Sequence, residues 1–342
     1  MEGRGRAMSR SYLVGLDMGG TNIRTAAVSA GGEVLLMRRG PARATSSAAE
    51  IVENIATQIL ALEKAANQQG LGRALALGVA VPGPLDLTTG TVIAAPHVKA
   101  WRSFPLRRAL EARLGRKVVV ENDANAWALG EFWRGAARGR KDVVLLTLGT
   151  GVGGGIIVDG KIVHGRIGMA GELGHVTVEP GGMRCDCGAL GCLEAYASAS
   201  GMRGLVEKAL GLERGAPLPE ALVDEGGDFS VRRMTAEARR GNALARSVFE
   251  IAGRYLGIAL ASFINIFDPE MIVIGGGVGG ALPFMRRAMS REIKARAFRA
   301  SAAQARIVRA ALGPRGGVVG AAYAAISPSR ARRMSQIAAF PQ

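Results

Sequence analysis

The sequence is poor in cysteine, histidine and aromatic residues, and it has no long apolar run. Its 342 residues include three cysteines and three histidines, and aromatic residues make up 5%. The longest apolar stretch, residues 255–267, is too short to cross a lipid hydrocarbon core and ends at an Asp-Pro pair, so we expect a buried helix. Residues 1–10 resemble a short disordered lead and not a signal sequence. We therefore expect a cytoplasmic protein without a membrane partner.

Acidic residues are outnumbered by basic residues, 28 to 44, which gives a formal net charge of +16. Such a charge attracts phosphate-bearing partners, including nucleic acid. The arginines recur singly or in pairs, with only loose enrichment between Arg286 and Arg333, and form no dense basic block. We therefore expect solvated basic faces and no nucleic-acid partner.

The three cysteines lie close together, at Cys185, Cys187 and Cys192. An odd, clustered set in a chain with no predicted export signal argues against a disulfide framework. The cluster is instead typical of a metal site.

Two halves of the chain open with the same succession of elements. An apolar strand at residues 12–16 enters a glycine turn, and strands at 23–29 and 33–39 follow. In the second half, a strand at 142–148 enters another glycine turn, and residues 156–165 form a hairpin around an Asp-Gly pair. This repetition predicts an α/β fold of two duplicated domains that face each other across a cleft.

The remaining elements set the expected domain boundaries. A long apolar helix at 243–267 and a basic helix from Leu282 are assigned to the second domain. We expect a lead at 1–10, a smaller N-terminal α/β domain at 11–128 completed by a returning helix at about 314–327, a larger C-terminal α/β domain at 129–313 and a tail at 328–342.

Three glycine-rich turns follow predicted strands. In the first, Asp17–Asn22, a carboxylate precedes two glycines that would let backbone N–H groups approach an anion, although a simple hairpin is the alternative. The second, Gly149–Gly155, contains G-x-G-x-x-G, but a strand follows it and a dinucleotide site needs a helix there. Residues 155–162 have P-loop spacing but lack the Ser or Thr that holds magnesium, so neither motif is accepted.

The third glycine turn, Gly275–Gly280, also fits G-x-G-x-x-G and lies between a strand and a helix. It is the best case for a Rossmann motif, but no ribose-binding strand is identifiable after it. Contact with the adenosine part of a nucleotide explains it as well. Together the three turns favour a nucleotide held in a cleft.

Six motifs occur in an order that resembles a known protein family. They are LDMGGTN, VPGPLD, ENDANAWALGE, LGTGVGGG, GELGH and CDCGALGCLE. Together they closely resemble the ROK family (repressor, open reading frame, kinase) of bacterial sugar kinases, from about Tyr12 to about Ile326. The resemblance implies the duplicated, ribonuclease H-like fold of actin, hexokinase and Hsp70, with an interdomain cleft. It also implies ATP-dependent phosphorylation of a hexose.

The resemblance assigns ligand contacts to residues within these motifs. It implies a first phosphate turn made by Asp17, Gly19, Gly20, Thr21 and Asn22, in which Asp17 also positions hydrated Mg²⁺. It implies a second phosphate turn made by Gly149, Thr150 and Gly151. It implies an adenosine contact made by Gly275, Gly276 and Gly277. The implied hexose ligands are Asn122, Asp123, Glu172, His175 and Glu194.

Within the ENDAN motif, Asp123 would be the general base. Phosphoryl transfer needs positioning, charge neutralisation by magnesium and a carboxylate that accepts the hydroxyl proton. Asp123 follows a strand at the start of a predicted helix, where the helix dipole and the terminal N–H groups favour its ionised form. The local sequence alone favours a simple helix N-cap, and the surrounding motif reverses that preference.

His175 completes the predicted metal site, because it lies ten residues before Cys185. One imidazole and three thiolates form a closed tetrahedral shell, so His175, Cys185, Cys187 and Cys192 are predicted to bind a structural Zn²⁺. The spacing differs from the paired C-x2-C of zinc fingers, and a chance cysteine cluster is the alternative. Zinc would order the loop that presents Glu172 and Glu194 to the sugar.

One segment departs from the family pattern. Where these kinases often carry Asn after a proline, this chain has His97, which is either a donor to a sugar hydroxyl or an ordinary loop histidine. Repressors of the same family carry a helix-turn-helix domain ahead of the kinase-like core. About eleven residues precede the first strand here, and Asp17, Asp123 and the second turn are present, so we expect an enzyme and not a non-catalytic sugar-sensing regulator.

Glucose is the expected substrate, because GELGH together with GCLE resembles the glucokinase branch of the family. N-acetylmannosamine, N-acetylglucosamine and fructose kinases share much of this set and stay open as alternatives, as does polyphosphate as the donor. The resemblance also implies a homodimer.

Overall fold

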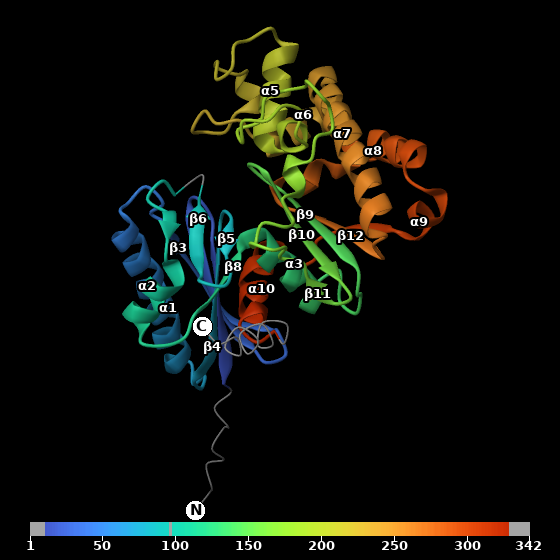
Figure 1. Cartoon of the computed structure of the whole chain (residues 1–342). Helices are drawn as coiled ribbons and strands as arrows, with labels where there is room; N and C mark the ends of the chain where they lie inside the picture. The colour runs from blue at the N-terminus through green and yellow to red at the C-terminus, as the bar shows by residue number, and fades with distance from the viewer. Residues whose placement is uncertain (1–10, 96–97, 328–342) are drawn as a thin grey trace, which may run out of the picture. The chain divides into compact units, whose positions relative to one another are not determined.

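The computed structural model describes residues 11–95 and 98–327, which divide into two compact units (Figure 1). Unit 1 contains the described residues up to Gly139, the segment His164–Ala170 and the described residues from Pro314 onward. Unit 2 contains Arg140–Val163 and Gly171–Gly313. The expected lead at 1–10, the expected tail at 328–342 and His97 lie outside the described residues.

Unit 1 differs from the expected N-terminal domain at two places. It continues past residue 128, to Gly139. It also includes His164–Ala170, which the sequence placed in the second domain. That segment belongs to unit 1 because His164 bonds to Glu121 at 3.0 Å and Gly168 packs against the backbone of Leu85.

Unit 1 carries two sheets and four α-helices among its described residues. Its elements are β1 (Tyr12–Met18), β2 (Asn22–Ser29), β3 (Val34–Pro41), α1 (Ala48–Gln68), β4 (Ala74–Val81), β5 (Leu85–Asp86), β6 (Thr91–Ala94), β7 (Arg102–Phe104), α2 (Leu106–Leu114), β8 (Val119–Asn122), α3 (Asp123–Arg134) and α10 (Gly316–Ala324).

Unit 2 carries one five-stranded sheet and a larger set of helices. Its elements are β9 (Val143–Leu148), β10 (Val152–Val158), β11 (Lys161–Ile162), η1 (Leu173–His175), α4 (Glu194–Ala197), α5 (Ala199–Ala209), η2 (Glu220–Leu222), α6 (Val231–Arg239), α7 (Ala243–Phe267), β12 (Met271–Gly275), η3 (Gly277–Ala281), α8 (Leu282–Arg296), α9 (Arg299–Gln304) and β13 (Arg306–Arg309). A short 3-10 turn, η4 (Gly313–Arg315), leads from unit 2 into unit 1.

The five-stranded sheets of the two units have the same topology. Their strand orders are β3-β2-β1-β4-β8 and β11-β10-β9-β12-β13. In each sheet the first three strands along the chain form an antiparallel meander. The fourth strand pairs in parallel with the first, and the fifth pairs in parallel with the fourth. The expected fold class, a duplicated α/β fold, is confirmed by this repeated order.

Helix α1 forms where its cap and apolar spacing predict it. Ser47 and Glu50 make a capping box, in which each side chain bonds to the other's backbone. The face toward the core carries the fully buried residues Ile51, Ile55, Ile59 and Leu62.

Helix α10 packs so closely on unit 1 that glycine is required at the crossing points. A side chain at Gly78 of β4 would overlap the carbonyl group of Ala321, and one at Gly320 would overlap that of Ala126 in α3. The described C-terminal part of the chain is therefore built into the core of the same unit as the N-terminal strands.

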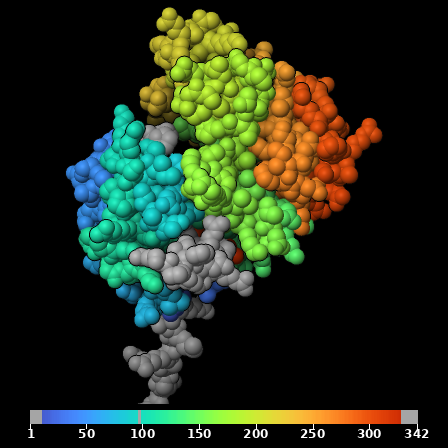
Figure 2. Space-filling view, in the orientation of Figure 1, coloured from blue at the N-terminus to red at the C-terminus, as the bar shows by residue number. Residues whose placement is uncertain are grey.

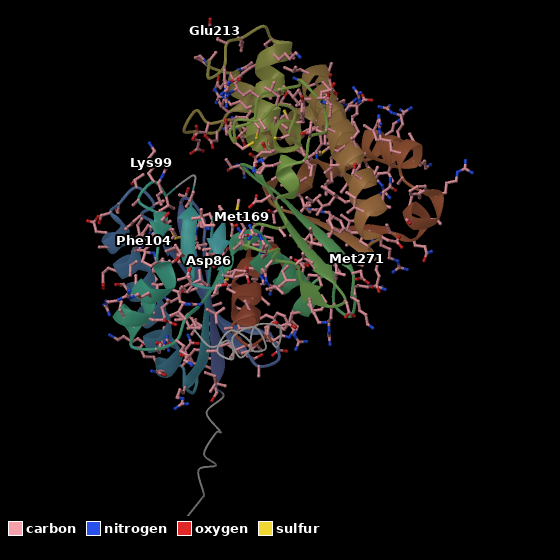
Figure 3. The ribbon with its side chains drawn as sticks, viewed as in Figure 1. Asp86, Lys99, Phe104, Met169, Glu213 and Met271 are labelled. Atoms are coloured by element: carbon pink, nitrogen blue, oxygen red, sulfur yellow. The ribbon has the colours of Figure 1, made fainter. Side chains whose placement is uncertain are left out.

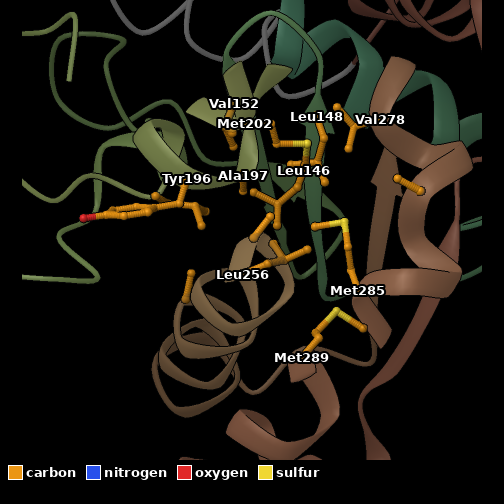
Figure 4. Packing of buried hydrophobic residues seen from close by; sticks show 14 of the residues in the cluster. Leu146, Leu148, Val152, Tyr196, Ala197, Met202, Leu256, Val278, Met285 and Met289 are labelled. Atoms are coloured by element: carbon orange, nitrogen blue, oxygen red, sulfur yellow. The ribbon is translucent and has the colours of Figure 1, made fainter. Parts of the chain in front are cut away.

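Helix α7 is long and apolar enough to span a membrane by composition, with a mean hydropathy of 1.4 in its most apolar window. However, 67% of that window is buried inside the protein. Its Leu256 packs with Leu146 and Leu148 of β9 and with Met285 of α8 (Figure 4). The side chains of α7 and α8 form adjoining orange surfaces of unit 2 (Figure 2). The expectation of a buried core helix is confirmed.

Several short elements are absent from the sequence-based prediction. They include the small sheet of β5, β6 and β7, whose strands have two to four residues, and the short helices of unit 2 before α7. Segments of this length are too short to show a hydrophobic period. The basic helix from Leu282 also ends at Arg296, because Ala297 is extended, and α9 follows as a separate turn.

Candidate active site

Three parallel strands of unit 1 end at one edge of its sheet and place polar residues there. Strand β1 pairs with β4, and β4 with β8, all in parallel. The register aligns Asp17 with Ala80 and Asn122 with Val81. Ligands of open α/β sheets bind at the carboxyl ends of such strands. Asp17, Asn122 and Asp123 therefore share the edge where a ligand is expected.

Asp17 is a buried carboxyl group, 4% exposed. Its Oδ2 lies 3.5 Å from the guanidinium of Arg24, and its side chain also hydrogen-bonds to Trp127 of α3. Gly317 of α10 leaves room for it, since a Cβ there would lie 2.5 Å from the Asp17 Cγ. Burial raises the pKa of Asp17 to about 6, and Arg24 opposes that rise. A divalent cation nearby would stabilise this carboxylate, which fits the predicted role toward Mg²⁺.

The first predicted phosphate turn connects β1 and β2. The N–H of Gly19 donates to the carbonyl oxygen of Asn22 at 2.9 Å and closes the turn. Gly20 and Thr21 at its tip are exposed. Arg39 Nε donates to Asn22 Oδ1 at 3.0 Å, so a positive charge lies beside the turn. This arrangement suits a phosphate group.

The helix cap at this sheet edge is made by Asn122 and not by Asp123. Asn122 Oδ1 accepts the N–H of Asn125 at 3.1 Å, and its Nδ2 donates to the carbonyl oxygen of Gly83 at 3.2 Å. Asp123 is the first residue of α3, is half-buried and accepts the N–H of Ala124 at 2.8 Å. The alternative that Asp123 is the N-cap is therefore wrong. The helix N-terminus still favours its ionised form.

In unit 2, the second predicted phosphate turn joins β9 to β10. The N–H of Gly149 donates to the carbonyl oxygen of Gly151 at 2.9 Å. The carbonyl oxygens of Gly149 and Thr150 accept the N–H groups of Ala199 and Ser200, at the start of α5, which hold the turn in place. No described atom lies within 4 Å of the position that a Cβ of Gly149 would take. The open space beside this backbone suits a phosphate.

The third glycine turn lies at the same edge of the unit 2 sheet. Gly275 ends β12, which runs parallel to β9. Gly276 has φ +89°, and a side chain there would overlap the carbonyl group of Leu148, the last residue of β9. By contrast, the position of a Cβ at Gly277 is clear of described atoms within 4 Å. The two predicted nucleotide contacts of unit 2 are therefore neighbours.

The predicted metal ligands of unit 2 converge. The nitrogen and sulfur atoms of His175, Cys185, Cys187 and Cys192 all lie within 4.8 Å of one another. Cys187 Sγ is 3.7 Å from Cys192 Sγ, and Cys185 Sγ is 3.7 Å from His175 Nδ1. A tetrahedral zinc shell requires about 3.8 Å between sulfurs and about 3.6 Å between sulfur and nitrogen. The donor set and its spacing therefore fit Zn²⁺.

His175 links this cluster to a carboxylate. Its Nδ1 faces the cysteines, while its Nε2 lies 4.0 Å from Glu172 Oε2. Partial burial raises the pKa of Glu172, an effect that His175 opposes and Glu194 reinforces. At 4.0 Å the Glu172 carboxylate lies near the outer nitrogen of His175 but beyond hydrogen-bond distance. His175 therefore has separate nitrogens for the metal and for the predicted sugar-binding group.

Glu194 connects the cysteine cluster to the second phosphate turn. One of its oxygens accepts the N–H of Val152, directly after the turn, at 2.8 Å, and the other lies 3.6 Å from Cys185 Sγ. A side chain at Gly151 would overlap this carboxylate. The structure thus brings together the residues predicted in unit 2 for phosphate, sugar and zinc.

Three residues of the unit 1 edge were not predicted from the sequence. They are Arg24, Arg39 and Trp127. The signal for Arg24 was available, because the antiparallel register of β1 and β2 places it directly across from Asp17. Trp127 becomes recognisable only after α3 is docked against β1.

Comparisons with known proteins identify the family of this chain. A profile of the ROK family matches residues 13–327. The glucokinase of Halalkalibacterium halodurans is 38% identical over 320 residues, 92% of this chain and 95% of the relative. The structure of a ROK family glucokinase from Streptomyces griseus, in complex with glucose and AMPPNP, is 34% identical with a TM-score of 0.76, and the match covers 92% of this chain and 99% of that one.

A regulator of the same family is also similar. The structure of a ROK family transcriptional regulator, a homologue of the Escherichia coli MLC protein, is 29% identical with a TM-score of 0.81, and the match covers 93% of this chain and 78% of that one. The chain belongs to the ROK family.

The cysteine cluster predicts that the purified protein carries about one zinc per chain. Cys192→Ser removes a buried ligand, so it should lower both the zinc content and the melting temperature. Ser262→Ala, on an exposed part of α7, serves as the control and should change neither. Metal analysis by mass spectrometry measures the zinc content. A purified protein that contains no zinc and keeps its activity after chelation would contradict the predicted zinc site.

The burial of Asp17 predicts a pH-dependent cost in stability. The folded protein binds the Asp17 proton more tightly than the unfolded chain, because its pKa is about 6 and not 3.8. Its contribution is therefore most favourable below about pH 4 and is lost as the pH rises through 6. Without magnesium and nucleotide, Asp17→Asn should raise the free energy of unfolding at pH 8 by about 1–3 kcal/mol, and the gain should shrink toward pH 4.

Urea denaturation at the two pH values measures this effect. Asp142→Asn is the control, because this half-buried carboxylate just before β9 accepts the N–H of Asp159 and an asparagine oxygen can accept it as well. An Asp17→Asn protein no more stable than wild type at pH 8 would show that the buried carboxylate is already neutralised by Arg24.

Proposed function

We propose that this protein is an ATP-dependent glucokinase, which converts glucose and ATP to glucose 6-phosphate and ADP. The supporting observation is the position of Asp123 at the first turn of α3. Because Asn122 supplies the helix cap, the fold does not require a carboxylate at position 123 for capping. A carboxylate placed there in the field of a helix N-terminus is suited to accept a proton from a sugar hydroxyl.

The residues around Asp123 orient it in this proposal. Asn122 holds the start of α3 and the Gly83 turn, so its contact with a sugar hydroxyl has to share or replace one of these bonds. Glu172, His175 and Glu194 complete the set of hexose ligands. Their carboxylates and imidazole match the several hydroxyl groups of a hexose, which are both donors and acceptors.

The glycine turns receive the nucleotide. ATP supplies the phosphoryl group when it is bound, and Mg²⁺ neutralises the charge on its phosphates. The turns at Gly19–Asn22 and Gly149–Gly151 offer backbone N–H groups to phosphate oxygens, and Gly275–Gly277 contacts the adenosine part. Asp17 holds the hydrated magnesium, which relieves the unfavourable burial of its carboxylate.

Zinc acts structurally in this proposal. His175, Cys185, Cys187 and Cys192 form a closed shell with no open position for a substrate. The metal fixes the loop on which Glu172 and Glu194 lie. We also propose that the enzyme works in the cytoplasm as a homodimer; light scattering of the purified protein tests the second part.

A sugar-sensing regulator is the second candidate, favoured by the structural likeness to a regulator of the same family. A protein of this class would bind sugar without phosphorylating it. The retained Asp17 and Asp123, both in their motifs, support the enzyme instead.

A coupled assay with a panel of sugars tests the proposed function. With ATP, glucose should give a kcat/KM at least about tenfold above those of fructose, N-acetylmannosamine and N-acetylglucosamine. Polyphosphate in place of ATP tests the donor. A higher value for another sugar would change the substrate, whereas no turnover together with sugar-dependent DNA binding would favour the regulator.

A further inference from the structure

A buried carboxylate lies two residues before the proposed base, and its hydrogen-bond partners Asn122 and Asn125 lie on either side of that base. Glu121 is 1% exposed. Its Oε1 accepts the N–H of Asn122 at 3.0 Å and the Nδ2 of Asn125 at 3.4 Å. These two partners precede and follow Asp123 in the chain. The Glu121 side chain therefore holds the backbone segment that carries the base.

The other oxygen of Glu121 faces a histidine from a distant part of the sequence. His164 Nε2 lies 3.0 Å from Glu121 Oε2, and the His164 side chain is 8% exposed. None of the roles proposed above uses either residue. Both belong to unit 1, although His164 follows β11 of unit 2 directly along the chain.

The segment after His164 is fixed to unit 1 at further points. The N–H of Ala170 donates to the His164 carbonyl oxygen at 3.1 Å and closes the segment into a loop. Gly168 has φ +82° and lies against the carbonyl group of Leu85, so no larger residue fits there. Figure 3 labels Met169 of this loop and Asp86, which follows Leu85. The next residues along the chain, Gly171 and Glu172, begin the turn that carries the proposed sugar ligands.

Resting on the proposed function, we propose that Glu121 and His164 are a positioning pair for the sugar-phosphorylating site. Glu121 holds the backbone N–H of Asn122 and the side chain of Asn125, on either side of Asp123. His164 supplies the donor that this buried carboxylate needs, and it anchors the loop from which the Glu172–His175 turn departs. The pair therefore positions the segment that carries Asp123 and the loop that precedes Glu172, without touching the substrate.

Removing the His164 donor is expected to disturb the position of Asp123. A buried carboxylate that loses a partner is strongly destabilised and moves or takes up water. Movement of the Asn122–Asn125 backbone would displace Asp123, and displacements of about 1 Å can cost about a hundredfold in rate. The proposed phosphate turn of unit 2 is held by its own bonds to α5, so we expect ATP binding to change less than kcat.

His164→Leu removes the donor, and His164→Gln keeps one at a similar reach. We expect kcat with glucose to fall about 10- to 100-fold in His164→Leu, with KM for ATP within about twofold of wild type. His164→Gln should recover most of that loss. Loss of activity in proportion to lost folded protein, or equal loss in both variants, would overturn the proposal.

Arg203→Leu is a matched control in unit 2. Arg203 Nε donates to Glu207 at 2.8 Å, and Glu207 is a carboxylate 4% exposed that lies outside the proposed site. Like His164→Leu, this variant leaves a buried carboxylate without one of its hydrogen-bond donors, so it should lower the melting temperature. It should not lower kcat per folded enzyme, and a kcat loss like that of His164→Leu would reduce the pair to a general stability effect.

Amide hydrogen exchange tests the pair independently of turnover. In folded His164→Leu, the amides of residues 122–125 should exchange faster than in wild type, and in His164→Gln they should not. Unchanged exchange in His164→Leu would overturn the proposal even if the protein phosphorylates glucose. A wild type that phosphorylates no sugar but shows this exchange pattern would contradict the proposed function and leave the backbone role of the pair in place.

Discussion

The junction between β8 and α3 is the constraint on which the proposed chemistry depends. A strand that ends at a sheet edge turns directly into a helix, so the first N–H groups of that helix need acceptors. The side chain of Asn122 accepts the N–H of Asn125, and the side chain of Glu121 accepts the N–H of Asn122. Because Asn122 makes the N-cap bond, Asp123 takes the first helical position, where its Oδ1 accepts the N–H of Ala124 and its carboxylate lies in the helix field.

The same reasoning applies to the zinc loop of unit 2. Its backbone would be costly to order by packing alone, since much of it is turn and bend. The sulfur and nitrogen atoms of the cluster are spaced as a tetrahedral metal requires, and Glu194 extends from this loop to the N–H of Val152. In the proposed function, a structural ion bound here would order the sugar ligands and the neighbouring phosphate turn together.

The sequence predicted the features that leave a local signature. The capping box of α1, the Asp-Gly hairpin and the glycine turns follow from a few adjacent residues, and the structure has them where expected. Trp127 and the Glu121–His164 bond come from segments distant in sequence, so no local pattern marks them. The choice of Asn122 over Asp123 as the cap is a matter of one residue at a helix boundary, which depends on backbone dihedral angles and not on residue type.

Single-turnover kinetics of Asp123→Asn test the central claim most directly. Asparagine keeps the shape of the side chain but cannot accept the hydroxyl proton at neutral pH. The account predicts that phosphoryl transfer to glucose slows by about 10²- to 10⁴-fold, while glucose affinity measured by calorimetry changes little. A variant that transfers phosphate at a near-normal rate would contradict the assignment of Asp123 as the base.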